Sequence, residues 1–197
     1  MSHGDKPERS YHHGDLARTL VDIASARVAK GEPIALRAIA LEAGVSATAT
    51  YRHFANKEAL ESAVAAKGYR QLTEALEHAR PAALTRENLW ELACAYVDFA
   101  LLNRAMFSLM MSSECDPTSP VRLDAVATLR ACVTDAITPL WPEYSDSQEK
   151  LESLIFSLWS WIHGCAMLHL EGKVPAEDSQ QIRNRVRAAW ELTGFAH

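Results

Sequence analysis

The segment Leu36–Lys57, LRAIALEAGVSATATYRHFANK, decides the fold of this chain. Apolar residues at three- and four-residue steps predict a short helix over 36–43. Gly44 follows, and a glycine tolerates the left-handed backbone that a tight turn between two helices requires. Ser46 then offers a hydroxyl that can cap a second short helix over 47–53. Two short helices joined by such a turn form a helix-turn-helix.

The second helix of this motif has the composition of a DNA-reading helix. Its alanines leave it slender enough for a major groove, and its threonine, tyrosine and arginine side chains can hydrogen-bond phosphates or base edges. Arg37 in the preceding helix can clamp the DNA backbone, and Lys57 in the following helix can pair with a phosphate. The predicted DNA-contacting residues are Arg37, Ser46, Ala47, Thr48, Tyr51, Arg52, His53 and Lys57.

Several of these side chains have a structural alternative. Tyr51 and Phe54 could both be core aromatics, and we assign Phe54 to the core and Tyr51 to DNA. His53 is open between a phosphate contact and a structural hydrogen bond. Arg52 is open between a base contact and a solvated charge.

The sequence on both sides of this motif is also helical in pattern. Alanine, leucine, glutamate and arginine dominate, and only eight glycines and eight prolines interrupt them. We expect an all-α fold of about nine helices, with a three-helix helix-turn-helix head over 11–71 and a larger ligand-binding and dimerisation body over 72–197. The boundary falls within the fourth helix, which links the two parts. The further helices are predicted at 14–30, 56–79, 86–102, 104–112, 120–138, 147–170 and 179–194.

Bulk properties argue against several other classes of protein. No run of 18 apolar residues occurs, and Met1–Lys6 lacks the apolar core of a secretory signal, so we expect no membrane span. The cysteines are too scattered for a disulfide framework, which favours a cytoplasmic location. Residues 1–60 carry eight Lys/Arg and seven Asp/Glu (net +1), whereas residues 61–197 carry twelve and eighteen (net −6). This asymmetry permits DNA binding by the N-terminal part.

Four short stretches resemble the tetracycline-repressor (TetR) family. The resemblance is close over about residues 11–70 and implies a three-helix DNA-binding head on an otherwise helical dimer. It implies DNA contacts, mainly to the backbone, for Arg37, Thr48, Tyr51, His53 and Lys57. Thr50 departs from the family, whose members usually carry a bulkier apolar residue there. The matching stretches are YHHGDL at Tyr11–Leu16, LRAIA at Leu36–Ala40, AGVS at Ala43–Ser46 and YRHFANK at Tyr51–Lys57.

The long helix predicted at 147–170 is apolar on two sides, so both sides must be covered. One side can face its own core, and a second copy of the chain is the simplest cover for the other. The helix at 179–194 carries a further apolar stripe, so we expect a four-helix dimer interface. Such a dimer would present two reading helices to a palindromic operator about 34 Å apart. Repression is the commoner role in the family.

The body is also expected to hold a small apolar or amphipathic effector. Trp159–Gly164 resembles the C-terminal domain of a family branch recognised by a Trp-His-Gly signature, here with Ile162 inserted. The alternative is that the same aromatic and methionine side chains form plain core. Effector binding would displace the fourth helix and spread the heads. The predicted effector-binding residues are Tyr96, Phe99, Met106, Phe107, Met110, Trp159 and His163.

Two other functions are compatible with parts of the sequence. A metal- or thiol-responsive regulator could use Cys165 and His169, which stand four residues apart on one helical face. A small helical enzyme would need a nucleophile–base pair or a phosphate loop, and neither motif is present in the sequence. We therefore predict no catalytic residue, no metal and no cofactor.

Overall fold

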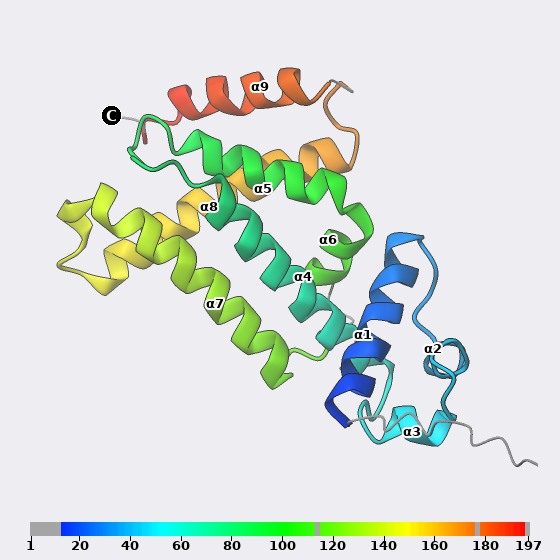
Figure 1. Cartoon of the computed structure of the whole chain (residues 1–197). Coiled ribbons are helices and arrows are strands. Elements are labelled where there is room, and N and C mark those ends of the chain that lie inside the picture. Colours follow the sequence, from blue (N-terminus) through cyan, green and yellow to red (C-terminus); the bar gives the residue numbers. More distant parts are fainter. Residues whose placement is uncertain (1–12, 113–114, 176–177, 196–197) are drawn as a thin grey trace, which may run out of the picture.

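The computed structural model describes residues 13–112, 115–175 and 178–195 of the chain. Within these ranges it contains nine α-helices and two short 3₁₀ helices and no strand, which confirms the predicted all-α class (Figure 1). Tyr11 and His12, which carry part of the family resemblance, lie outside the described residues.

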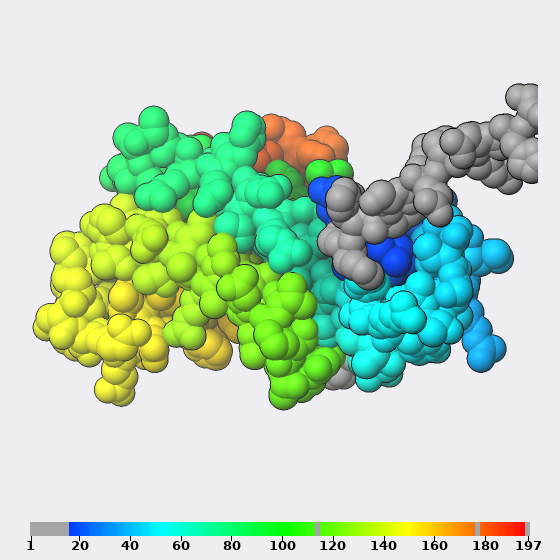
Figure 2. Space-filling view, turned by 60° about the horizontal axis from the view of Figure 1, so that its bottom comes forward, coloured from blue at the N-terminus to red at the C-terminus, as the bar shows by residue number. Residues whose placement is uncertain are grey.

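The N-terminal head consists of α1 (His13–Ala29), α2 (Leu36–Glu42) and α3 (Ala47–Tyr51). Gly44 between α2 and α3 has a φ of 69°, so the predicted left-handed turn is confirmed. Leu20, Ile39 and Leu60 have no exposed surface and form the centre of the head. In the space-filling view the head, coloured blue to cyan, forms a lobe at one end of the molecule (Figure 2).

The body is built around α4, which runs unbroken from the head through the boundary predicted at residues 71 and 72. Figure 1 shows α4 in the middle of the molecule, with α7 on one side and α5 and α6 on the other. The helices of the body are α4 (Lys57–Ala79), α5 (Trp90–Leu102), α6 (Arg104–Met111), α7 (Pro120–Ile137), α8 (Gln148–Leu170) and α9 (Ser179–Leu192). The 3₁₀ helices Thr138–Leu140 and Pro142–Tyr144 lie between α7 and α8.

Helix α9 ends at Leu192 rather than at 194, and two other predicted helices are also shorter than the sequence pattern indicated. Helix α5 begins at Trp90 rather than at 86, because Thr85 and Asn88 close a turn in which each side chain accepts the other's backbone N–H, at 3.3 and 2.8 Å. Helix α3 ends at Tyr51 rather than at 53, where the backbone N–H groups of His53 and Phe54 share the carbonyl of Thr50. Both differences arise from local hydrogen bonds at helix ends.

Helix α6 joins the body to the head. It packs against α4 and also against α1. Gly68 of α4 makes the close approach possible: a Cβ atom there would lie 2.6 Å from Sδ of Met110 and 2.9 Å from Sδ of Met106. Any movement of α6 therefore shifts its packing contacts with both α4 and α1.

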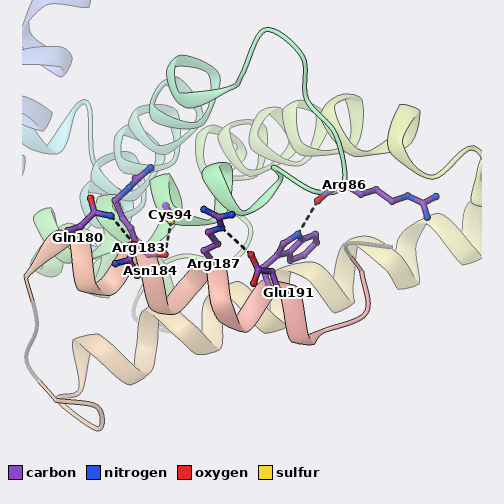
Figure 3. Close-up of polar contacts among 8 residues, drawn as sticks. Arg86, Cys94, Gln180, Arg183, Asn184, Arg187 and Glu191 are labelled. Atoms are coloured by element: carbon purple, nitrogen blue, oxygen red, sulfur yellow. Dashed lines mark hydrogen bonds and ion pairs between the residues drawn. The ribbon is translucent and has the colours of Figure 1, made fainter.

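The apolar stripe of α9 faces the chain's own core. Val186 and Trp190 are 1% exposed, and the helix packs against α5. Figure 3 shows how it is tied down: the indole N–H of Trp190 donates to the carbonyl of Arg86 at 3.0 Å, and the Cys94 thiol lies 3.9 Å from the carbonyl of Arg183. The expectation that this stripe lies in a dimer interface was therefore wrong, since the stripe is used within the monomer.

The outward side of α9 is polar. Gln180 bonds Asn184 at 2.9 Å, and Arg187 pairs with Glu191 at 3.1 Å (Figure 3). These pairs are four residues apart, as neighbours on a helix surface must be.

Helix α8 keeps its second side uncovered. By length and composition alone this helix could cross a membrane. Leu154, Leu158 and Ile162 are buried against the core. The opposite side is a line of small residues that ends in the half-exposed Leu168, and the line consists of Ser153, Ser157, Ser160 and Gly164. A Cβ added at Gly164 would meet nothing within 4 Å.

Candidate functional site

The first candidate site is the outer surface of α3. Ser46 caps this helix, and its hydroxyl accepts the N–H of Ala49 at 3.2 Å, as predicted. The cap fixes where the helix starts, and therefore which side chains face outward. Thr50 faces inward with no exposed surface, so this departure from the family occupies the core position. Among the described residues its hydroxyl has no hydrogen-bond partner.

The predicted DNA-contacting side chains divide into exposed and partly covered groups. Thr48, Tyr51 and Arg52 are exposed and lie three and four residues apart on one side of α3, with Tyr51 48% exposed. Arg37 at the start of α2 and the capping Ser46 are also exposed. Ala47 and His53 are partly covered, and Phe54 packs against the core as assigned.

Lys57 has a partner that sequence reasoning missed. Its ammonium lies 2.9 Å from a carboxylate oxygen of Glu61, one turn along α4. The Lys57 side chain is 46% exposed, whereas that of Glu61 is only 5% exposed. A lysine has three N–H donors, and this pair uses one of them.

The second candidate site is a cavity of about 700 Å³ in the body, bounded mainly by α4, α5, α7 and α8. Its wall is mostly apolar, and a cavity of this size suits a small organic molecule. Arg130 of α7 and Glu152 of α8 pair at 3.3 Å on this wall, and both are about half exposed, so the cavity reaches the surface between these helices.

Three of the seven predicted effector-binding residues line this cavity: Tyr96, Met110 and Trp159. Phe99, Met106 and Phe107 are buried in the core and do not line it. His163 also lies outside the lining and contacts it through Tyr96. Sequence reasoning missed the contributions of α4 and α7, which include the polar residues Tyr69 and Arg122. The apolar face of α7 was a usable signal, because it repeats at Val126, Leu129 and Val133.

His163 supports Tyr96 from behind the cavity wall. The Tyr96 hydroxyl and Nδ1 of His163 are 3.0 Å apart, and the imidazole stacks on Phe107 with ring centres 5.8 Å apart. Burial raises the pKa of Tyr96 to about 12 and lowers the pKa of His163 below its ordinary value. Both groups are therefore neutral at pH 7, and the tautomer of the imidazole decides which of the two donates the hydrogen bond.

Tyr69 and Arg122 form the other polar part of the wall. The Tyr69 hydroxyl donates to the carbonyl of Met110 at 2.8 Å, which joins α4 to α6. Burial raises the pKa of Tyr69, and the guanidinium of Arg122 beside the hydroxyl opposes that rise. Nε of Arg122 is buried and has no hydrogen-bond partner among the described residues.

The two residues considered for a metal or thiol sensor, Cys165 and His169, lie one turn apart on α8. Nδ1 of His169 lies 2.7 Å from the backbone carbonyl of Cys165. Burial raises the pKa values of Cys94, Cys132 and Cys165, so their thiols stay protonated and weakly reactive at neutral pH. Across the described ranges, no three histidine, cysteine or acidic side chains gather in a way that could hold a metal ion.

Two models of one protein family match separate parts of the chain. Residues 89–190 match the family model described as "Tetracyclin repressor-like, C-terminal domain". Residues 32–64 match the model described as "Bacterial regulatory proteins, tetR family". No curated protein is significantly similar to the chain in sequence.

Solved structures share the whole fold. A protein of unknown function from Rhodococcus sp. RHA1 is 28% identical, with a TM-score of 0.76 over 96% of this chain and 100% of that one. A tetR-family transcriptional regulator from Streptomyces coelicolor is 19% identical, with a TM-score of 0.66 over 93% and 87% of the two chains. The regulator PfmR from Thermus thermophilus is 20% identical, with a TM-score of 0.53 over 89% and 96%.

Proposed function

The chain belongs to the tetracycline-repressor family of transcriptional regulators, and from that premise we propose that it is a cytoplasmic repressor. In this proposal a homodimer binds a palindromic operator, and a small apolar or amphipathic effector releases it. Regulators of this family are in general DNA-binding proteins rather than enzymes, and we propose no catalytic activity for this chain.

The observation that carries the proposal is the outward face of α3. We assign base or phosphate contacts to Thr48, Tyr51 and Arg52, which this short helix holds on one exposed side. Arg37 and Lys57 would grip the phosphates on either side. Ser46 and Ala47 stand at the start of α3, where the helix would meet the groove, and His53 would add a contact from its end.

The uncovered side of α8 supports the dimer. Its line of serines and Gly164 would allow two copies of the helix to approach closely across a two-fold axis. The polar outer side of α9 would lie beside this contact and complete a four-helix interface. A two-fold dimer places two copies of α3 in successive major grooves, about 34 Å apart.

The contacts of α4 and α6 support coupling between cavity and head. Met110 of α6 lines the cavity, and its carbonyl accepts the Tyr69 hydroxyl of α4. Helix α6 also packs on α1, and α4 continues directly from the head. An effector that prefers a shifted arrangement of these helices would change the spacing of the two heads and weaken operator binding.

Selection of bound sequences from random double-stranded DNA with the purified full chain tests this function. We expect an enriched palindrome whose half-sites lie about one helical turn apart. The variant Tyr51→Ala, with the same fold by circular dichroism, should fail to enrich it. Enrichment of no motif, or of a non-palindromic one, would contradict the proposed dimeric operator binding.

A further inference from the structure

We propose that the effector is an amphipathic organic anion whose carboxylate binds Arg122 and whose apolar body fills the cavity between α4, α5 and α8. The binding part of this proposal stands on the cavity itself. Its consequence for DNA rests on the proposed function.

Arg122 differs from the other charged residues on the cavity wall. Arg130 and Glu152 are paired with each other near the surface. Glu77 and Arg80, at the end of α4, are exposed to solvent. Arg122 is half-buried, its Nε is fully covered, and no acceptor for that nitrogen lies among the described residues.

Two groups that Arg122 influences have hydrogen-bond partners of their own. Asp116 is one, and its carboxylate accepts the backbone N–H of Thr118 at 2.8 Å and the Thr118 hydroxyl at 2.7 Å. Those hydrogen bonds, and secondarily Arg122, lower the pKa of Asp116. Tyr69 stays protonated and donates its proton to Met110, so it offers Arg122 only a neutral oxygen.

A cation covered on one side by apolar groups is costly unless an anion meets it. A carboxylate fits a guanidinium because two parallel N–H groups can bond its two oxygens. Tyr69 would act as a positioning residue that holds the guanidinium at this wall. The ligand therefore needs a carboxylate or an equivalent planar anion at this end.

The rest of the cavity requires an apolar ligand body. Leu72 and Leu76 of α4 and Trp159, Trp161 and Ile162 of α8 line it. An alkyl chain or an aromatic ring would replace water against these side chains, with a gain in proportion to the apolar area buried. The two requirements together describe a carboxylic acid with a substantial hydrocarbon part.

The anchor lies where the cavity meets the connection to the head. Tyr69 follows Gly68, the residue that allows Met106 and Met110 of α6 to pack closely on α4. An anion that pairs with Arg122 would therefore act on the same contact between α4 and α6. This placement would give the carboxylate, rather than the tail, the larger influence on the heads.

The test compares decanoate with decan-1-ol, which share a tail and differ in the head group, by calorimetry and tryptophan fluorescence at pH 7.5 without DNA. We expect decanoate to bind at least about 10-fold more tightly, the ratio of a charge-assisted hydrogen bond. Arg122→Gln should bring the two affinities within about 3-fold of each other. Arg122→Lys keeps the charge and should keep most of the preference. Arg187→Gln, a change at a paired arginine of α9 that does not line the cavity, should leave the preference unchanged.

Equal binding of acid and alcohol, binding of neither, or a preference that survives Arg122→Gln would overturn the proposal. If Arg122→Gln does not fold, the ratio of decanoate affinity to decan-1-ol affinity in the wild type and in Arg122→Lys still tests the proposal. Adding decanoate to the operator complex separates the two hypotheses. Binding through Arg122 with no change in DNA affinity would leave the anion site intact and refute effector-controlled release.

Discussion

The hydroxyl of Tyr96 lies 3.0 Å from Nδ1 of His163, and this hydrogen bond joins α5 to α8 at the edge of the cavity. It ties a residue that lines the cavity to one that does not, and both are held in neutral form by burial. Uptake of a proton by His163 would therefore change this hydrogen bond at the cavity wall.

His163 should make the protein less stable in mild acid. Its folded-state pKa is lowered from 6.5, so below pH 6.5 the unfolded chain takes up the proton more readily than the folded one. The contribution of His163 to the free energy of unfolding is therefore complete above pH 6.5. It is lost as the pH falls from 6.5 through the lowered folded-state pKa of His163. His163→Asn keeps an acceptor for Tyr96 but cannot titrate, so its urea midpoint should fall less between pH 7.5 and 5.5. An equal fall in both proteins would contradict this assignment.

Thr50 and Thr48 should respond oppositely to the same substitution. Thr50 is fully buried and its hydroxyl has no partner among the described residues, so Thr50→Val should raise the free energy of unfolding by about 1 kcal/mol. Thr48 is exposed on the other side of α3, so Thr48→Val should change operator affinity and leave stability within about 0.5 kcal/mol. Urea unfolding and operator titration measure both effects. Loss of stability in Thr50→Val would show that its hydroxyl is satisfied.

The substitutions Arg37→Ala and Lys57→Ala should weaken operator binding equally but differ in their effect on the stability of the protein. Each substitution by alanine removes one proposed phosphate contact, so operator affinity should fall about 10-fold and the salt slope by about 1. Lys57→Ala also leaves the covered carboxylate of Glu61 without this partner, which should cost about 1 kcal/mol of stability. Arg37→Ala serves as its control. An unchanged salt slope in both variants would remove these residues from the DNA interface.

Gly68→Ala should disturb the junction between α4 and α6. The new methyl group would lie 2.6 Å from Sδ of Met110, and the overpacking should cost about 1–3 kcal/mol, more than the gain of about 1 kcal/mol in helix propensity. Met110→Ala removes the nearest clashing atom and leaves Sδ of Met106 at 2.9 Å, so the double variant should be less destabilised than the sum of the single ones. Urea unfolding of the four proteins gives the coupling energy. Strict additivity would mean that the methyl group is accommodated without Met110.

Gly164→Arg should convert the dimer to a monomer. A Cβ atom at this position meets nothing within 4 Å in the chain itself, so the monomer should fold normally. In the proposed dimer the arginine would stand between two copies of α8 and raise the dissociation constant at least about 100-fold, as expected for a blocked and charged contact. Sedimentation measures this, with Leu102→Arg as a control at an exposed apolar residue of α5. A dimer that persists in Gly164→Arg would place the interface elsewhere.

The cavity could be only half predicted from sequence. Tyr96, Met110 and Trp159 belong to segments whose aromatic and methionine content indicated an effector site. Tyr69 and Arg122 stand 53 positions apart on helices whose packing no local pattern specifies. Phe99, Met106 and Phe107 have the same composition as a cavity wall but fill the core, because burial depends on which helix covers them.

The head was determined by sequence alone, because its features depend on neighbours within a few residues. Gly44 supplies a left-handed turn, and Ser46 and Asn56 cap the helices that follow them. Tertiary structure decided which sides of α8 and α9 are covered by other helices of the same chain. Both helices are amphipathic, and Trp190 of α9 is buried within its own chain, whereas the side of α8 with its serines and Gly164 stays open. An amphipathic pattern requires that a face be covered, and only packing determines by what.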